Sequence, residues 1–423
     1  MKKIITILSV ALLGFNASSQ VVEDTAVMGA FYANQVYYSL ANGEVATVSN
    51  TNWDLAFSAS GHGAAGSAIL INEGDVELYA YPGDTANWST FDTTGYANWE
   101  RLLNSDTSWV NGALNVRRGA RGFFDMGWGM LNPQNNFWTL GDSLYLAKLS
   151  DDSYRKLWIV SLKTGVWEFK YANVDGSNEQ TFTIDKATYP NRNFVYHSME
   201  TNTTIDREPD NTTWDLMFGK HTDYVFPPGM YVPVTGVFNN RNVWSAKAFL
   251  GDSATAAGAT EAQTDLNQNV VNIGRTWKKR VQGNWVVYDS IAYFAYDNDS
   301  TNFYRIVFTG FESGFGPGNL GKAIFNTELL HTVGIEGVEK NMKLSMYPNP
   351  ATDKVTLLLD YPENDVMNVE LINLSGQIVY REQLNLNAGI NQKTIRVDNL
   401  QSGIYLLNIV NAEFKSTQKL IVR

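Results

Sequence analysis

The chain contains an internal duplication, and this repeat constrains its fold more than any other feature of the sequence. The segment Val36-Tyr37-Tyr38-Ser39-Leu40 is followed by Trp53-Asp54-Leu55-Ala56-Phe57. Their counterparts are Val195-Tyr196-His197-Ser198-Met199 and Trp214-Asp215-Leu216-Met217-Phe218. The landmarks keep their order at a spacing of about 150 residues, which indicates a duplicated domain and not a solenoid of short repeats. We therefore expect two related domains, at 28–187 and 188–332.

The local pattern predicts strands throughout. Aromatic residues make up 13% of the sequence, and aromatic and β-branched side chains suit pleated sheets. Residues 144–149 and 154–160 flank the polar turn 150–153, as in a β-hairpin. Helical periodicity is scarce. The expected fold class is all-β, with two tandem β-rich domains followed by a small C-terminal β-sandwich.

The Trp-Asp-Leu-x-Phe unit is expected to supply core anchors. In an extended strand, Trp53, Leu55 and Phe57 point to one face of the sheet. Asp54 and Asp215 would then cap a turn or pair with an arginine.

The N-terminus predicts a cleaved signal peptide over residues 1–19. Met1-Lys2-Lys3 is positive, residues 4–15 are apolar, and Ala17-Ser18-Ser19 supplies small residues for cleavage before Gln20. The apolar run is too short to span a bilayer, so we expect no integral membrane protein.

Composition excludes several function classes. A formal net charge of −11 argues against nucleic-acid binding, which needs a basic stripe. The absence of cysteine excludes thiol catalysis, cysteine-ligated zinc and iron–sulfur clusters.

The C-terminal segment 342–423 follows a glycine-bearing linker at 333–341 and reads as short strands separated by turns. It resembles the type A C-terminal sorting domain of the type IX secretion system. That resemblance implies export through the periplasm to the outer cell surface or medium, with the secretion machinery and its sorting protease as partners. The matching residues are Tyr347, Pro348, Asn349, Pro350, Gly376, Gly403, Tyr405, Lys419 and Arg423.

The duplicated part resembles a second family. A tyrosine-bearing strand, a Trp-Asp strand and a later hairpin with Tyr154-Arg155 or Tyr304-Arg305 are similar to the HmuY-like haemophores of Bacteroidetes. This resemblance implies two secreted, β-rich HmuY-like domains, and haem as a cofactor held between axial ligands.

The haem interpretation needs axial donors in each copy. The chain has four histidines, and the two axial histidines of the founding family member cannot be matched within either copy. The candidate donors are His62 with Met126 or Met130, and His221 with Met230. His197 replaces Tyr38 across the repeat, which indicates a strand surface position. A histidine beside glycines is commonly exposed, and methionine commonly fills gaps in a core. The alternative that neither copy binds haem therefore stays open.

Two other functions fit the sequence. A carbohydrate-binding or adhesive surface protein is indicated by the tryptophans of the first copy, which form either a satellite core or a binding face: Trp88, Trp99, Trp109, Trp128 and Trp138. A hydrolase without a recognisable motif is the other alternative. We expect no enzyme, because the sequence contains no nucleophile elbow, His-Glu-x-x-His motif or P-loop. The Gly-x-Gly-x-x-Gly match at 316–321 is interpreted as a loop. Residues 297–301 are interpreted as a hairpin turn, and a calcium site is the less favoured alternative.

Overall fold

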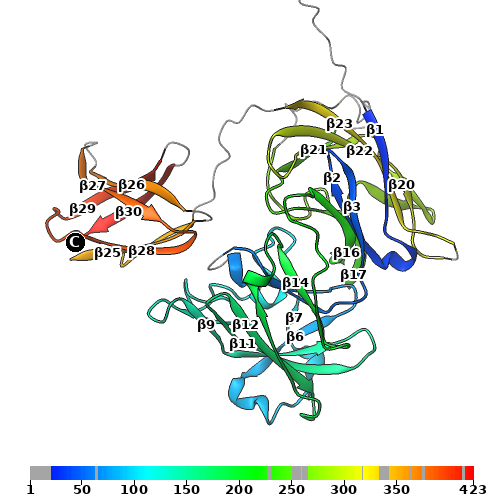
Figure 1. Cartoon of the computed structure of the whole chain (residues 1–423), viewed down its shortest axis with the longest axis horizontal. Helices are drawn as coiled ribbons and strands as arrows, with labels where there is room; N and C mark the ends of the chain where they lie inside the picture. The colour runs from blue at the N-terminus through cyan, green and yellow to red at the C-terminus, as the bar shows by residue number, and fades with distance from the viewer. Residues whose placement is uncertain are drawn as a thin grey trace, which may run out of the picture.

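The computed structural model describes residues 21–61, 65–225, 230–249, 259, 265–316, 318–332, 343–361, 364–373, 377–411 and 415–423. The predicted signal peptide and the predicted linker lie outside these residues. Regular structure in the described part is almost entirely β (Figure 1), which confirms the all-β class. The helical elements are 3-10 turns: η1 (Ala30–Tyr32), η2 (Ala65–Ser67), η3 (Thr85–Trp88), η4 (Tyr96–Asn98), η5 (Ala113–Asn115) and η6 (Lys186–Thr188).

A first β unit is built from two sheets that share one hydrophobic core. One sheet has the order β13-β12-β11-β10-β6-β7, with β8 and β9 joined through β11, and the other has the order β15-β14-β4-β5. The strands are β4 (Leu55–Ser58), β5 (Ile69–Ile71), β6 (Glu77–Asp84), β7 (Arg101–Leu102), β8 (Gly129–Asn132), β9 (Trp138–Gly141), β10 (Ser143–Lys148), β11 (Tyr154–Lys163), β12 (Val166–Asn173), β13 (Gln180–Asp185), β14 (Phe194–Ser198) and β15 (Thr203–Ile205).

A second β unit has its own core and combines the start of the chain with residues that follow the first unit. Its sheets have the orders β1-β23-β22-β21-β18 and β17-β16-β2-β3, with the hairpin β19-β20 beside them. The strands are β1 (Val21–Val27), β2 (Asn34–Ser39), β3 (Gly43–Ser49), β16 (Leu216–Val225), β17 (Met230–Asn239), β18 (Ser245–Phe249), β19 (Lys278–Val281), β20 (Asn284–Val287), β21 (Ile291–Tyr296), β22 (Asn302–Glu312) and β23 (Lys322–Thr332).

The two sequence copies exchange their first strands. β2 of the first copy pairs with β16 of the second, and β14 of the second copy pairs with β4 of the first. The registers are equivalent, since Tyr38 lies opposite Leu216 as His197 lies opposite Leu55. In Figure 1 the blue strands β2 and β3 accordingly lie beside the later strands β16 and β17. The predicted ranges 28–187 and 188–332 follow the duplication in the sequence. The β units defined by strand pairing differ from these ranges: the first contains residues 55–205, and the second combines residues 21–49 with residues 216–332.

The Trp-Asp unit holds these exchanged strands in place. The Asp54 carboxylate accepts the Met199 N–H at 2.6 Å, and the Asp215 carboxylate accepts the Leu40 N–H at 2.6 Å. Both carboxyl groups are therefore buried backbone acceptors. The Tyr37 and Tyr196 hydroxyls meet at 3.4 Å, where the equivalent strands of the two copies come together.

One expectation about this unit is wrong. Leu55 and Phe57 enter the core of the first unit, but Trp53 packs in a separate cluster with Ala56. The reason is that β4 begins at Leu55, so the strand alternation does not extend back to Trp53.

The C-terminal segment forms the expected β-sandwich with its own core. One sheet has the order β24-β25-β28 and the other β27-β26-β29-β30. The strands are β24 (Lys343–Tyr347), β25 (Lys354–Tyr361), β26 (Asp365–Asn373), β27 (Ile378–Leu386), β28 (Gly389–Arg396), β29 (Gly403–Val410) and β30 (Lys415–Val422).

Candidate functional site

The described residues include only the two methionines among the haem-ligand candidates of the first copy, so their pairing with His62 stays a prediction. His62 lies outside them. Met126 is buried in the core of the first β unit, where its sulfur accepts a hydrogen bond from the Ser67 hydroxyl at 3.3 Å. Met130 lies on β8 opposite Leu140. Met126 thus serves as packing.

The candidates of the second copy are separated along one hairpin. His221 lies opposite Val234, whereas Met230 lies opposite Val225. Four strand positions, or about 13 Å along the backbone, therefore separate the two residues, and their pairing at one iron stays a prediction. Burial lowers the pKa of His221 to about 4, so its imidazole is neutral at physiological pH. Met230 is half exposed.

His197 is buried, which corrects the expected surface position. Its imidazole hydrogen-bonds the Tyr171 hydroxyl at 3.0 Å and the Thr204 hydroxyl at 3.1 Å. Burial lowers its pKa to about 4. The side chain is a satisfied core group.

The tryptophans of the first copy divide between core and satellite cluster. Trp128 is fully buried and donates to the Ser67 carbonyl at 3.0 Å. Trp88 and Trp99 belong to a partly buried aromatic cluster packed on β10. The Lys170 ammonium lies 4.4 Å from the centre of the Trp88 ring. The Trp88 ring is therefore in contact with a cation of the same unit.

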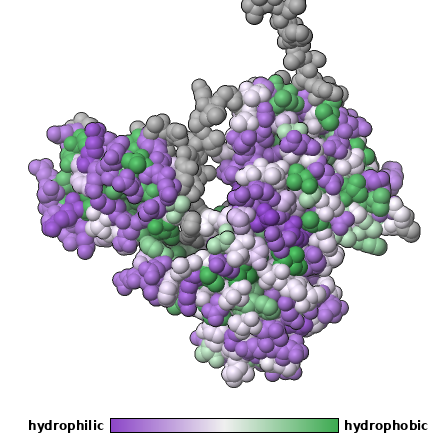
Figure 2. All heavy atoms as spheres, in the orientation of Figure 1, coloured by the Kyte–Doolittle hydropathy of each residue, from purple (hydrophilic) through white to green (hydrophobic). Residues whose placement is uncertain are grey.

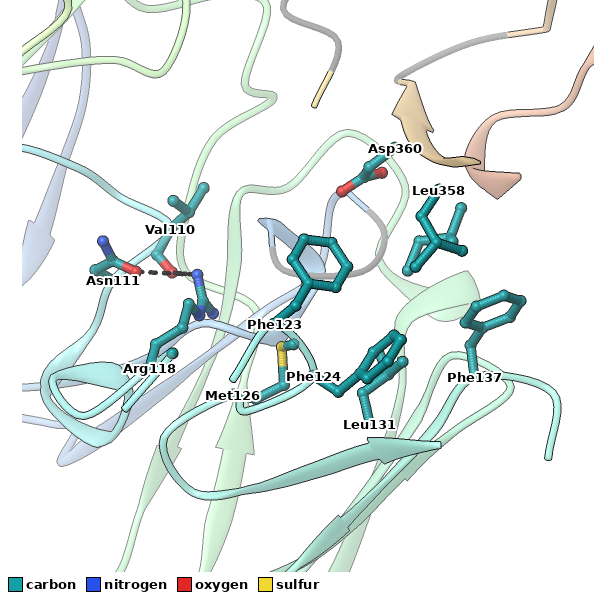
Figure 3. Close-up of a pocket in the computed structure, with 12 residues that line it drawn as sticks. Val110, Asn111, Arg118, Phe123, Phe124, Met126, Leu131, Phe137, Leu358 and Asp360 are labelled. Carbon is teal, nitrogen blue, oxygen red and sulfur yellow. Dashed lines mark hydrogen bonds between the residues drawn. The ribbon is translucent and has the colours of Figure 1, made fainter. Parts of the chain in front are cut away.

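An apolar pocket of about 310 Å³ lies between the first β unit and the C-terminal sandwich. Figure 3 shows Phe123, Phe124 and Phe137 below Leu358 and Asp360 of β25. The Arg118 guanidinium at one end donates to Asn111 Oδ1 at 2.9 Å and to the Val110 carbonyl at 2.7 Å. Its charge is therefore used to hold the surrounding loop.

A second pocket, of about 350 Å³, combines exposed aromatic rings with basic side chains, and we call it the aromatic–basic pocket. It is built on the second β unit, with one residue from the first. Its lining consists of Phe31, Tyr32, Gly74, Lys220, Pro233, Val234, Thr235, Arg275, Lys278, Trp285 and Phe315.

The rings at the mouth of this pocket are presented to solvent. Phe31 is 63% exposed, Phe315 62% and Trp285 39%. Phe31 and Tyr32 both have left-handed backbone conformations, with φ of 53° and 56°. Such a conformation is costly for residues that carry a Cβ. Phe315 packs edge-on against both rings, at centroid distances of 5.9 and 5.3 Å.

The charges of the pocket are all of one sign. Lys220, Arg275 and Lys278 are cationic, and no acidic residue is among the lining residues. Lys220 pairs with Asp75 at 3.3 Å, and Arg275 pairs with Asp223, both carboxylates lying outside the lining. Lys278 instead donates to the Thr235 carbonyl at 2.8 Å and lies 4.1 Å from the Trp277 ring centre. Burial, with a smaller contribution from Arg275, lowers the pKa of Lys278 to about 7.

Sequence reasoning missed this pocket because its residues share no motif. They come from η1, the loop between β5 and β6, β16, β17, the segment before β19, the β19-β20 hairpin and the loop after β22. The only local signal is the glycine-rich segment after Phe315. Figure 2 shows a largely hydrophilic face on which hydrophobic residues gather in separate patches.

Two further features were tested against the described residues. No group of three or more histidine, aspartate or glutamate residues in that part of the chain is arranged to hold a metal ion. Asp297 accepts the backbone N–H groups of Thr301 and Asn302 at 2.9 and 3.0 Å, as in a hairpin turn.

The sorting-tail residues come together at one end of the C-terminal sandwich. The Asn349 side chain donates to the Lys419 carbonyl at 2.8 Å and accepts the Ile421 N–H at 2.9 Å. The Arg423 N–H donates to the Ala351 carbonyl at 2.8 Å, and the Tyr405 hydroxyl donates to the Gln401 carbonyl at 2.7 Å. Gly376 lies outside the described residues. The other tail residues, apart from buried Tyr405, have exposed side chains or backbone: Tyr347, Pro348, Asn349, Pro350, Gly403, Lys419 and Arg423.

Comparison with known proteins identifies this segment. Residues 345–423 match the family model described as the secretion system C-terminal sorting domain. No curated protein matches the chain. Among the described residues, no helix is long and apolar enough to cross a membrane.

Solved structures give only weak similarity. Dimeric latent PorU from Porphyromonas gingivalis aligns at 9% identity and a TM-score of 0.19, over 84% of this chain and 31% of that one. Native E. coli alpha-2-macroglobulin aligns at 10% identity and a TM-score of 0.16, over 95% of this chain and 22% of that one. The chain thus spans less than a third of either, and these scores carry no argument about its fold or function. The assignment rests on the tail: residues 345–423 are a C-terminal sorting domain, and the chain is a type IX secretion substrate delivered to the cell surface or exterior.

Proposed function

We propose that this secreted protein is a non-catalytic carbohydrate-binding protein whose aromatic–basic pocket takes an acidic sugar. The observation that carries the proposal is the combination of exposed rings with three cations and no lining carboxylate. The flat faces of Phe31, Phe315 and Trp285 suit the apolar C–H face of a sugar ring. The basic side chains suit a carboxylate or sulfate on that sugar, and charge-assisted hydrogen bonds fix its orientation.

The size of the pocket agrees with this proposal. Its volume of about 350 Å³ lies at the lower end of the range of small-molecule sites, roughly 300–1,000 Å³. A single sugar or a short fragment of a chain is the ligand that such a volume accommodates.

Enzyme activity is not part of the proposal. The carboxyl group with the most enzyme-like setting is that of Glu73, in a neighbouring cleft, where burial raises its pKa to about 7. Its two oxygens accept the backbone N–H groups of Asn104 at 2.5 Å and Thr222 at 2.8 Å. Glu73 therefore serves to join the two β units.

A tetrapyrrole is the second candidate ligand. Its flat ring and carboxylate side groups match the same rings and cations of the aromatic–basic pocket. The pairing of His221 with Met230 has no support from the hairpin register, so this proposal does not include axial ligation by that pair.

Titration of the purified chain with galacturonate oligomers, neutral galactose oligomers and haemin tests these proposals. We expect binding of the acidic oligomer only. Trp285→Ala and Lys278→Met should each weaken it about tenfold or more, equivalent to ~1.4 kcal/mol. Trp138→Ala is the matched control, because Trp138 lies on β9 of the first unit. Equal binding of neutral and acidic oligomers would contradict the charge argument. A Soret shift with haemin that Trp285→Ala abolishes would favour the tetrapyrrole.

A further inference from the structure

A second cavity adjoins the aromatic–basic pocket and shares part of its wall. This cavity has a volume of about 340 Å³, and both cavities are lined by Gly74 and Pro233. Gly74 lies between β5 and β6 of the first β unit, and Pro233 lies on β17 of the second. The shared residues therefore form a neck at the junction of the two units.

The neck depends on the absence of a side chain at position 74. A Cβ added to Gly74 would lie 2.9 Å from Cε and 3.0 Å from Nζ of Lys220, closer than ordinary contacts allow. Lys220 lines the aromatic–basic pocket and pairs with Asp75, which lines the second cavity. A larger residue at 74 would therefore displace the Lys220 side chain at the junction of the cavities.

The second cavity offers different chemistry. Tyr231 is 44% exposed, and the Arg101 guanidinium lies 5.3 Å from the centre of its ring. Four acidic and two basic residues line it, with Lys148 paired to Asp152 at 2.7 Å and Arg101 near Glu77 at 3.6 Å. These groups accept and donate hydrogen bonds, and the excess of carboxyl groups disfavours an anion, which suits the hydroxyl groups of a neutral sugar.

We infer that the two cavities are adjacent subsites of one groove and that the ligand is an oligosaccharide chain. An acidic sugar would occupy the aromatic–basic pocket, the chain would cross the neck at Gly74 and Pro233, and a following sugar would stack on Tyr231. This inference rests on the proposed function, because it extends the same site along the groove.

Calorimetric titration with acidic oligomers of increasing length, in which one galacturonate is joined to neutral galactose units, tests the inference on the full chain. We expect affinity to rise about tenfold or more between a fragment that fills one pocket and an oligomer that spans both. Tyr231→Ala should remove that gain and leave the affinity for the short fragment unchanged. Gly74→Val should also remove the gain, but it should weaken binding of the short fragment as well, because it displaces Lys220 of the aromatic–basic pocket. Val271→Ala, a change in the second unit away from both cavities, is the control for general destabilisation.

The outcomes separate the inference from the proposed function. If the long and short oligomers bind equally and Tyr231→Ala changes neither, the groove is wrong but the single pocket stands. If no acidic oligomer of any length binds, the proposed function itself fails. If polyglutamate binds as tightly as the long oligomer, charge alone explains binding, and the sugar subsite at Tyr231 is overturned.

Discussion

Lys278 shows how its surroundings set the properties of one side chain. Its ammonium lies 4.1 Å from the Trp277 ring centre and 4.6 Å from that of Phe311, and only 8% of the residue is exposed. Burial disfavours the charged form, which is why its pKa falls to about 7. An anion in the aromatic–basic pocket would favour the protonated lysine and would itself be bound more tightly by it.

The first prediction concerns the pH dependence of binding. Affinity for an acidic ligand should rise as the pH falls from about 8 to about 6, because protonation of Lys278 accompanies binding. Isothermal titration at several pH values measures this. Lys278→Met should flatten the profile, and a wild-type profile without slope would contradict the assigned role of the ammonium.

Lys278 also makes the stability of the fold depend on pH. Its pKa is lower in the folded chain than in the unfolded chain, so the unfolded chain binds more protons between about pH 7 and pH 10.5. This residue therefore makes the fold more stable as the pH rises through that window.

At the scale of elements, the exchanged strands are fastened by two equivalent carboxyl groups. Asp54 holds the end of β14, and Asp215 holds the end of β2. Burial raises the pKa of each to about 6, partly offset by the backbone N–H groups that they accept. The folded chain then binds more protons than the unfolded chain between about pH 4 and pH 6. These two groups alone therefore reduce stability as the pH rises through that window.

The second prediction follows from this equivalence. Asp54→Ala and Asp215→Ala should each lower the free energy of unfolding by about 1–3 kcal/mol, because each leaves a buried N–H without its acceptor. Asp54→Asn and Asp215→Asn keep one acceptor oxygen and should cost less. Urea unfolding at neutral pH measures all four variants. A negligible effect of both alanine variants would show that the carboxylates do not fasten the strands.

The third prediction concerns which segments fold alone. A fragment of residues 50–210 contains every strand of the first β unit and should unfold cooperatively. A fragment of residues 188–332, the second copy by sequence, lacks β1, β2 and β3 and should not. Circular dichroism with thermal unfolding distinguishes the two. Cooperative unfolding of the 188–332 fragment would mean that the strand exchange is dispensable.

At the scale of the whole molecule, the C-terminal sandwich contacts the first β unit through the apolar pocket. Leu358 and Ile390 close the pocket over Phe124 and Phe137, and the Phe124 and Tyr347 rings lie 6.3 Å apart. The sandwich has a separate core, so its removal should leave the two β units folded.

The fourth prediction is that removing residues 333–423 exposes this apolar surface. Binding of a hydrophobic dye such as anilinonaphthalene sulfonate should increase several-fold, because contiguous apolar surface attracts such probes. Phe123→Ala combined with Phe124→Ala should suppress the increase. Equal dye binding by the full and shortened chains would show that the sandwich does not cover the pocket.

The strand-rich class, the duplication and the sorting tail can be read from the sequence alone. These follow from local information: alternating aromatic and β-branched residues, two copies of a Trp-Asp motif, and Tyr347-Pro348-Asn349-Pro350 near the C-terminus. The pairing of each first strand with one copy or the other depends on the tertiary structure. The first strands of the two copies have similar sequences, and so do the Trp-Asp strands with which they could pair. Periodicity therefore cannot distinguish pairing within a copy from pairing between copies.

The candidate site likewise depends on the tertiary structure and cannot be read from local sequence patterns. Phe31, Lys220 and Trp285 are distant in sequence and meet only because β2 pairs with β16 and the β19-β20 hairpin lies nearby. Pairing between distant strands depends on burial and backbone hydrogen bonding across the whole chain, which no local pattern encodes. The buried position of His197 has the same origin, since the partners that satisfy its ring nitrogens come from β12 and β15.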